Sequence, residues 1–349
     1  MENEISNFIK IWLTVLISWC YCYALSQRVP KGTNRLFCFL PIVCLFLYLP
    51  LHLSTMYLGG PSAFVIAWLA NFKLLLFAFG KGPLSSSMSL ARFVAIACLP
   101  IKIQQIPSTK FQDGEKSSLK NTIKALLMAM LIHVHRYEAH INPKILPFLY
   151  CLQLYISLEL VLAPMGTLAV VLLGLELEPQ FNEPYLSSSL QDFWGRRWNL
   201  VVSGILRPTI YEPTRNLATC LMDRNWAPIP AILGTFIVSG LMHELVFYYL
   251  GREKPTWELT CFFLLHGVCL AIEVALKKAF ARSWQFPWLI SGPLTIGFVM
   301  VTGFWLFLPS MRRCKVFERS TIEFAAAVGF LKNASRDIRN FVIPTSALM

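Results

Sequence analysis

The chain has 349 residues, of which 56% are hydrophobic and only 14% are charged, and its mean hydropathy is +0.55. A soluble domain would carry about a quarter charged residues, so the composition excludes a soluble globular protein and indicates a polytopic membrane protein. The net charge of +12 does not indicate nucleic-acid binding, because the basic residues are scattered over the predicted loops.

Eight apolar runs are long enough to cross a hydrocarbon layer of about 30 Å, which takes about 20 helical residues. We therefore predict an all-α transmembrane bundle of about eight spans, within a range of seven to ten, in one integral membrane domain over 1–349. The predicted spans are 7–25, 36–58, 61–79, 121–136, 146–172, 226–250, 257–276 and 287–309. The run 89–101 is too short to span and carries Arg92, which favours an interfacial or re-entrant segment.

Two long segments between the spans differ in character. Residues 104–120 are polar and rich in helix breakers, so they predict a flexible surface loop. Residues 173–225 keep aromatic and apolar side chains among their charges, which predicts short amphipathic helices at the interface or folded back into the membrane. We call 173–225 the site loop.

The distribution of basic residues predicts the orientation. The loops 26–35, 80–120, 173–225 and 277–286 hold 17 Lys and Arg, and the alternate loops without the tail 310–349 hold five. The positive-inside rule therefore places the first set in the cytosol and the amino terminus in the lumen. An even number of spans puts the tail in the lumen, and an odd number puts it in the cytosol.

The span 226–250 is the predicted catalytic helix, because His243 lies deep within its apolar run. An ionisable side chain inside a span is costly and marks a functional site by default. Helical spacing places five residues on one face of this helix: Phe236, Ser239, Gly240, His243 and Phe247. The small residues leave a gap beside the imidazole, and the two phenylalanines form aromatic walls above and below it. A structural histidine is the alternative; the adjacent Glu244 and the cluster described next favour catalysis.

The densest polar and aromatic cluster in the chain is Asp192-Phe-Trp-Gly-Arg-Arg-Trp-Asn199. On an α-helix Trp194 and Trp198 would stack on one face, and Asp192 and Arg196 would share another. Anchoring at the membrane interface is an alternative for the tryptophans and arginines. It does not account for Asn199, whose amide can donate to a carbonyl or oxyanion without the cost of burying a charge.

Other polar residues in the spans have more ordinary interpretations. Glu159, Asn71 and Lys73 are expected to satisfy one another or the interior of the bundle. His266 and Glu273 are seven apart on one helical face, which favours a supporting or structural role. Six dispersed histidines, and the lack of a His-Glu-x-x-His or Gly-x-Ser-x-Gly motif, argue against di-iron, zinc and serine-hydrolase chemistry. The lack of a His-x-x-x-x-Asp or His-His-x-x-x-Asp motif separates the chain from the glycerol-phosphate acyltransferases and the bacterial-type wax synthases.

Two site motifs, the cluster Asp192–Asn199 and the segment Ser239-Gly-Leu-Met-His-Glu244, resemble the plant wax synthase family within the membrane-bound O-acyltransferase superfamily. Gly59-Gly-Pro61 and Leu99-Pro-Ile-Lys-Ile103 share this resemblance. The resemblance covers nearly the whole chain. It implies acyl transfer from acyl-CoA to a lipid hydroxyl in the endoplasmic reticulum membrane, with His243 and Asn199 as catalytic residues. Larger members carry Phe-Tyr-x-Asp-Trp-Trp-Asn where this chain has Phe193-Trp-Gly-Arg-Arg-Trp-Asn199.

The expected reaction transfers a fatty acyl group to a long-chain fatty alcohol, with a sterol or diacylglycerol as alternative acceptors. His243 is expected to act as general base and Asn199 to stabilise the oxyanion. Arg196 and Arg197, with Arg207, would hold the CoA phosphates. Site support is expected from Trp198, Asp192, Ser239 and Glu244.

The expected partners are acyl-CoA, the lipid alcohol and membrane lipids; no cofactor, metal or nucleic acid is expected. A lipid transporter is the alternative from another class, and it would show inverted repeats and broken helices in both halves, which this sequence does not. An acyltransferase with a peptide acceptor is a further alternative, disfavoured by the plant-type motifs.

Overall fold

The computed structural model describes residues 2–104, 114–135, 137–174, 177–280, 287–326, 329 and 332. Within these ranges the regular secondary structure is helical, joined by turns and irregular segments, and the extended pairing is one isolated β-bridge between Ile103 and Leu177. The prediction of an all-α membrane bundle is confirmed.

The helices follow one another closely along the chain. The first half contains α1 (Glu2–Ser26), α2 (Thr33–Tyr48), η1 (Leu49–His52), α3 (Met56–Ala63), η2 (Phe64–Ala70), α4 (Asn71–Ala78), α5 (Leu90–Cys98), α6 (Gly114–His135), η3 (Glu138–His140) and α7 (Leu146–Leu173). The second half contains η4 (Pro184–Leu186), α8 (Leu190–Asp192), η5 (Phe193–Arg197), α9 (Leu200–Leu206), η6 (Arg207–Tyr211), α10 (Glu212–Ala218), α11 (Pro228–Gly251), α12 (Glu258–Ala279), α13 (Trp288–Thr302), η7 (Gly303–Phe307) and α14 (Leu308–Arg313).

Seven of the described helices are long and apolar enough to cross a membrane: Asn3–Ser26, Thr33–His52, Met56–Ala78, Leu146–Val171, Pro228–Gly251, Glu258–Ala279 and Trp288–Arg313. Each overlaps a predicted span. The predicted span 36–58 is wrong at its end, because η1 ends at His52 and residues 53–55 form a turn before α3. Pro228 and Pro230 lie in the first turn of α11, where their missing N–H groups are not needed.

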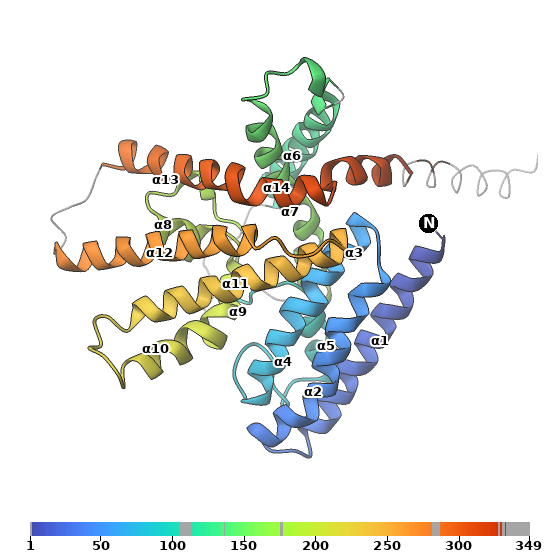
Figure 1. Cartoon of the computed structure of the whole chain (residues 1–349). Helices are drawn as coiled ribbons and strands as arrows, with labels where there is room; N and C mark the ends of the chain where they lie inside the picture. The colour runs from blue at the N-terminus through green and yellow to red at the C-terminus, as the bar shows by residue number, and fades with distance from the viewer. Residues whose placement is uncertain are drawn as a thin grey trace, which may run out of the picture.

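The amino-terminal helices form a core of their own. Figure 1 shows α1, α2 and α4 side by side in the lower right of the molecule. Their shared interior is aromatic: Trp19 contacts Phe46 and Phe93, and Phe77 stacks on Phe39 at 5.7 Å between ring centroids. The predicted interfacial segment forms the short helix α5, which closes this core.

Polar groups inside this part are used to join helices. Lys73 is 0% exposed, and its ammonium donates to the carbonyls of Ile96, Ala97 and Leu99 at the carboxyl end of α5. Three carbonyls satisfy its three N–H donors where the helix dipole is negative. Asn71 donates to the carbonyl of Ala67 in its own helix. Lys73 therefore bonds to α5 and Asn71 to its own helix, so the two residues do not pair with each other as one of the predicted arrangements had it.

The carboxyl-terminal helices form a second layer, in which α11, α12 and α13 run alongside one another (Figure 1). Two glycines bring α11 and α12 close together. A Cβ at Gly240 would lie 2.9 Å from the Thr260 Cα, and a Cβ at Gly267 would lie 2.8 Å from the Phe236 Cβ. Small residues at such crossings let the two backbones approach, which is how membrane helices gain packing contacts.

Charged side chains from distant parts of the chain hold the turn 50–57. Glu4 and Glu323 accept hydrogen bonds from its backbone N–H groups. Arg252 donates to three of its carbonyls, and Arg319 donates to the carbonyl of Ser54. The start of α1, the end of α11 and the segment after α14 therefore lie on one side of the membrane, in the upper right of Figure 1.

The position of these three segments on one side of the membrane constrains how often the chain crosses it between α4 and α11. Because α11 ends beside the turn, it begins on the opposite side, where α4 also ends, so the chain between 78 and 228 crosses an even number of times. α7 supplies one crossing. α6 has 22 residues, about 33 Å of helix, and pairs with α7 through Lys124 and Glu159 at 2.9 Å. An even number requires a second crossing beside α7, which α6 is long enough to supply, but its polar first turns keep it out of the seven helices that are long and apolar enough to span a membrane.

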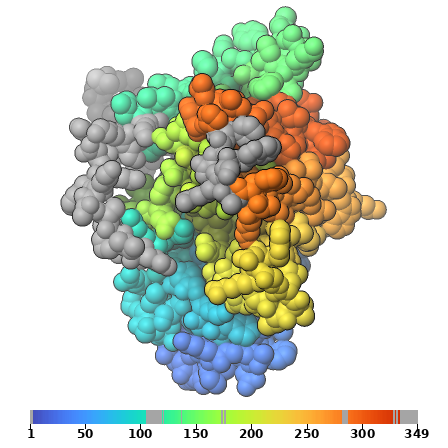
Figure 2. Space-filling view, turned by 90° about the vertical axis from the view of Figure 1, so that its left-hand side faces the viewer, coloured from blue at the N-terminus to red at the C-terminus, as the bar shows by residue number. Residues whose placement is uncertain are grey.

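The two predicted loops differ in outcome. Residues 105–113 of the first lie outside the described residues, but 114–120 belong to α6, so the helix begins earlier than the sequence indicated. The site loop contains the short helices η4 to α10, as predicted. Figure 2 looks onto the face where its yellow-green part lies between the cyan amino-terminal helices and the orange ends of α12 and α13.

Candidate functional site

His243 lies in the middle of α11, between two aromatic rings from other helices. Its imidazole stacks on Phe263 of α12, with ring centroids 4.2 Å apart and an angle of 29°. On another side it meets Trp68 of η2 edge to face, at 4.9 Å and 78°. Phe307 of η7 contacts it at 5.9 Å. The half-buried imidazole is thus flanked by aromatic rings from three other elements.

The hydrogen bond of His243 fixes which nitrogen carries its proton. Nδ1 lies 2.7 Å from the carbonyl oxygen of Ser239, one turn earlier. A carbonyl only accepts, so Nδ1 must be the protonated nitrogen of the neutral ring. No described residue hydrogen-bonds Nε2, whose lone pair is therefore free to accept a proton. The predicted supporting residue Ser239 acts here through its backbone carbonyl.

His266 is a second buried histidine, and all of its polar atoms are used. It is 0% exposed. The Trp194 indole N–H donates to His266 Nδ1 at 3.1 Å, and His266 Nε2 lies 2.8 Å from the Thr302 hydroxyl. Because an indole only donates, Nδ1 must accept, so the proton of the neutral ring is on Nε2 and points to Thr302. Thr302 in turn donates to the carbonyl of Phe298.

Glu273 holds the same segment one step further along α12. Its carboxylate accepts from the backbone N–H groups of Leu190 at 2.9 Å and Gln191 at 3.4 Å, and it pairs with Lys277 at 2.6 Å. These N–H groups belong to the first turn of α8, where a negative charge is favourable. His266 and Glu273, predicted to support the site from one helical face, therefore both attach the 190–198 segment to α12.

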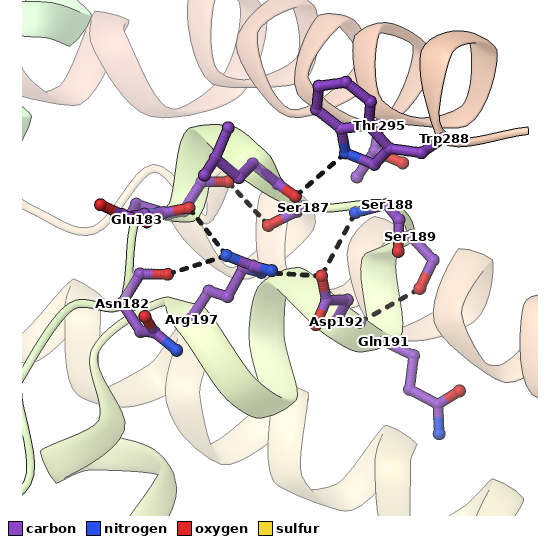
Figure 3. Close-up of polar contacts among 12 residues, drawn as sticks. Asn182, Glu183, Ser187, Ser188, Ser189, Gln191, Asp192, Arg197, Trp288 and Thr295 are labelled. Carbon is purple, nitrogen blue, oxygen red and sulfur yellow. Dashed lines mark hydrogen bonds and ion pairs between the residues drawn. The ribbon is translucent and has the colours of Figure 1, made fainter.

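Arg197 ties the site loop to itself, as Figure 3 shows. Its Nε donates to Asp192 Oδ2 at 2.8 Å, and NH1 donates to the carbonyls of Asn182 and Glu183, each at 3.2 Å. Arg196 is exposed. The guanidinium predicted to bind CoA together with Arg196 is thus engaged inside the protein, whereas Arg196 is accessible from water.

The predicted spacing within this cluster is wrong, because η5 is a π-helical turn. In a π-helix the backbone bond joins residues five apart, and here the Trp198 N–H donates to the Phe193 carbonyl at 2.8 Å. Asp192 therefore pairs with Arg197 and not with Arg196. For the same reason Trp198 stacks on Phe193, at 5.3 Å and 16°, while its contact with Trp194 is edge to face at 6.4 Å and 75°.

Asn199 begins the next helix in a left-handed backbone conformation, with φ of 40°. Its side-chain oxygen accepts from the backbone N–H of Val202 at 3.2 Å, the usual N-cap contact. The cap holds Oδ1 against α9, so Nδ2 is the part of the amide left to donate. Within the described residues no hydrogen bond or ring contact joins Asn199 to His243.

The two predicted catalytic residues are linked indirectly from two directions. Val201 and Val202, directly after Asn199, share a hydrophobic cluster with Trp68, whose ring meets His243. Trp194, on the other side of the motif, contacts Phe263 at 5.7 Å, and Phe263 stacks on His243. The site loop therefore converges on the walls of His243.

Sequence reasoning missed these walls. Trp68 and Phe263 are aromatic residues within apolar spans, where nothing in the pattern separates a site residue from a core residue. Glu244 was predicted to support the site, but its buried carboxylate is used elsewhere. It accepts from the Thr260 N–H at 3.2 Å and caps α12. Adjacent helical residues point about 100° apart, so a sequence neighbour of His243 need not share its site.

Comparisons with known proteins agree with this arrangement. Residues 177–265, which run from the site loop through α11 into α12, match the model of the "Membrane bound O-acyl transferase family". The chain is 47% identical to acyl-CoA–sterol O-acyltransferase 1 of Arabidopsis thaliana, over 97% of this chain and 99% of that protein. It is 44% identical to the long-chain-alcohol O-fatty-acyltransferase of Simmondsia chinensis, over 93% and 95%. It is 42% identical to the probable long-chain-alcohol O-fatty-acyltransferase 8 of Arabidopsis thaliana, over 98% and 100%.

Proposed function

This chain belongs to the membrane-bound O-acyltransferase family, in the same group as the long-chain-alcohol O-fatty-acyltransferases, and we propose that it esterifies long-chain fatty alcohols with acyl-CoA to form wax esters. The observation that carries this proposal is the state of His243. A neutral imidazole with a free Nε2 sits within a membrane-spanning helix and between aromatic rings. An alcohol with a long alkyl chain can bring its hydroxyl there from the lipid, and acyl-CoA can bring its thioester there from the interface.

The proposed chemistry needs a base, because an alcohol hydroxyl is too weakly acidic to attack a thioester unaided. His243 Nε2 accepts the hydroxyl proton while the alcohol oxygen bonds to the thioester carbon. The tetrahedral intermediate then expels the CoA thiolate, and the proton on Nε2 passes to that sulfur. General-base catalysis of this kind contributes about 10²–10⁴-fold. The Ser239 carbonyl keeps Nδ1 protonated, so that Nε2 is the nitrogen that works.

Asn199 is the proposed donor to the thioester carbonyl. Its Oδ1 is held by the Val202 N–H, which leaves Nδ2 to donate and fixes the rotation of the amide. The left-handed backbone, which Asn adopts more readily than most residues, and the cap together place this group at the start of α9. A neutral donor stabilises the developing oxyanion without bringing a charge into the membrane.

Acyl-CoA is proposed to approach from the face that carries the site loop. CoA bears several phosphate charges and stays in water, while its acyl chain prefers hydrocarbon, so the donor lies across the interface. Arg196 is exposed on η5 and suits the phosphates; Arg207 is exposed on η6 and pairs with Glu212 at 3.4 Å. This face is the predicted cytosolic one, in keeping with a proposed location in the endoplasmic reticulum membrane.

A sterol acceptor is the second candidate, because the sterol O-acyltransferase relative shares 47% identity over almost the whole chain. Purified protein in detergent-lipid micelles, incubated with labelled palmitoyl-CoA and hexadecanol, a plant sterol or diacylglycerol in parallel, distinguishes them. The proposal expects hexadecanol to give the highest kcat/KM. A higher kcat/KM for the sterol would show that the acceptor is a sterol and not a fatty alcohol. Failure to form an ester from any of the acceptors would contradict the proposed function itself.

A further inference from the structure

Trp68, which contacts His243, has an indole N–H without a hydrogen-bond partner among the described residues. It lies in η2, a π-helical turn, and is 2% exposed. Its ring is nearly perpendicular to the His243 ring at 4.9 Å. The indole Nε1–H is buried as well. A buried donor without a partner is unfavourable, so its position beside the base calls for a ligand that accepts.

Trp19 shows that the unpaired nitrogen alone is not sufficient. It is 0% exposed, and its indole Nε1 also has no partner among the described residues. Its ring contacts are with Phe46 and Phe93, in the core between α1, α2 and α5. The difference between the two tryptophans is their neighbour: Trp68 lies against the proposed base, and Trp19 lies against phenylalanines.

Trp68 is also linked to both proposed catalytic residues. It packs in one hydrophobic cluster with Val201 and Val202, which directly follow Asn199, and its ring meets His243. An acyl thioester attacked by an alcohol activated at His243 must place its carbonyl between these elements. Its oxygen is an acceptor that gains negative charge, and the Trp68 N–H is a donor with no other use.

We propose that the Trp68 indole N–H donates a hydrogen bond to the thioester carbonyl oxygen of acyl-CoA, and to the oxyanion formed from it, beside the Asn199 amide. This assignment rests on the proposed acyl transfer. As the alcohol oxygen bonds to the thioester carbon, the carbonyl π electrons move to the oxygen facing Trp68 and the hydroxyl proton moves to His243. When the C–S bond breaks, the carbonyl re-forms and the thiolate takes that proton.

An indole suits this role in a membrane. It only donates and it carries no charge, so it cannot compete with His243 for the proton. The donor acts mainly in the transition state, where the oxygen is most negative, so its loss lowers kcat more than it raises KM. Loss of one such donor typically lowers kcat by about 10²–10³-fold.

The test compares Trp68→Phe with the matched control Trp19→Phe, each of which removes one buried, unpaired indole N–H and keeps a ring. Ester synthesis from palmitoyl-CoA and the acceptor alcohol is measured, together with hydrolysis of palmitoyl-CoA without alcohol. Both reactions develop negative charge on the same thioester carbonyl oxygen. We expect kcat of both to fall by about 10²-fold in Trp68→Phe, with KM for the alcohol unchanged, and to stay within about twofold in Trp19→Phe.

A second variant separates the N–H from the shape of the ring. Replacing Trp68 by 3-benzothienylalanine substitutes sulfur for the N–H in a ring of nearly the same size, and we expect the same loss of kcat. An isostere variant as active as the wild type would overturn the proposal and leave Trp68 as a wall of the His243 site. This result decides the matter even if Trp68→Phe does not fold. A wild-type protein that makes no ester at all contradicts the proposed function instead.

Discussion

His266 is predicted to position the site and not to take part in proton transfer, and the change His266→Phe separates these roles. Phenylalanine keeps a ring between Phe262 and Phe298, which contact the imidazole at 4.3 Å and 4.9 Å. It removes the bond from Trp194 at 3.1 Å and the bond to Thr302 at 2.8 Å. Thr302 keeps its donor bond to the Phe298 carbonyl. One buried donor, the Trp194 N–H, is therefore left without a partner.

The size of the effect follows from that single donor. A buried group left unpaired costs about 1–3 kcal/mol. The cost falls on the conformation in which η5 is docked on α12, so the docked population relative to undocked conformations falls by about 5- to 150-fold. Because Trp194 also contacts Phe263, on which His243 stacks, we expect kcat to fall by at most this factor.

The assay is ester synthesis across pH, with thermal inactivation of the purified protein alongside. His266→Phe should lower kcat and the inactivation temperature but leave the shape of the pH–rate profile unchanged, because both nitrogens of His266 are bonded to Trp194 and Thr302 and neither takes part in proton transfer. His266→Asn, whose amide oxygen can accept from Trp194, should recover part of the activity. A His266→Phe protein with wild-type kcat and stability would refute the positioning role, and a changed pH profile would point to a role in proton transfer.

Further predictions concern the site loop, the helix crossing and the topology. Glu273→Ala should uncap α8 and expose the site loop to limited proteolysis, while Glu273→Gln, which keeps one acceptor, should be milder; equal proteolysis in both would contradict the capping role. Arg196→Ala should raise KM for acyl-CoA several-fold at normal abundance, whereas Arg197→Ala should lower abundance and thermal stability by breaking the Asp192 pair; the reverse pattern would show that the two roles are exchanged. Gly240→Ala should lower thermal stability because its Cβ meets the Thr260 backbone, and unchanged stability would show that α11 and α12 can separate at no cost. Protease digestion of sealed microsomes should treat tags at the two chain ends alike; protection of only one would contradict an even number of crossings.

Much of the fold was predictable because a membrane makes apolar length informative. The predicted spans missed what hydropathy does not record. The turn at 53–55 lies in an apolar run and is held by side chains from distant segments, including Arg252 and Glu323. The beginning of α6 at Gly114 was read as loop because its first residues are polar.

The site was predictable where a residue type was costly in its surroundings. His243 stood out because an ionisable group inside a span needs a reason. Trp68 and Phe263 did not stand out, because aromatic residues are ordinary there. The pairing within the Asp192–Asn199 cluster was mispredicted because α-helical spacing was assumed for a π-helical turn, which shifts partners from four residues apart to five.

The most direct test of the account is the change His243→Ala in purified protein, measured with labelled palmitoyl-CoA and hexadecanol. The account predicts that ester synthesis is lost, while the protein still accumulates, folds and binds acyl-CoA, because the imidazole contributes its free Nε2 to proton transfer. Its one backbone hydrogen bond and its ring contacts with Trp68, Phe263 and Phe307 cost some thermal stability when they are removed. A well-folded His243→Ala protein that still makes ester at a substantial fraction of the wild-type rate would contradict it.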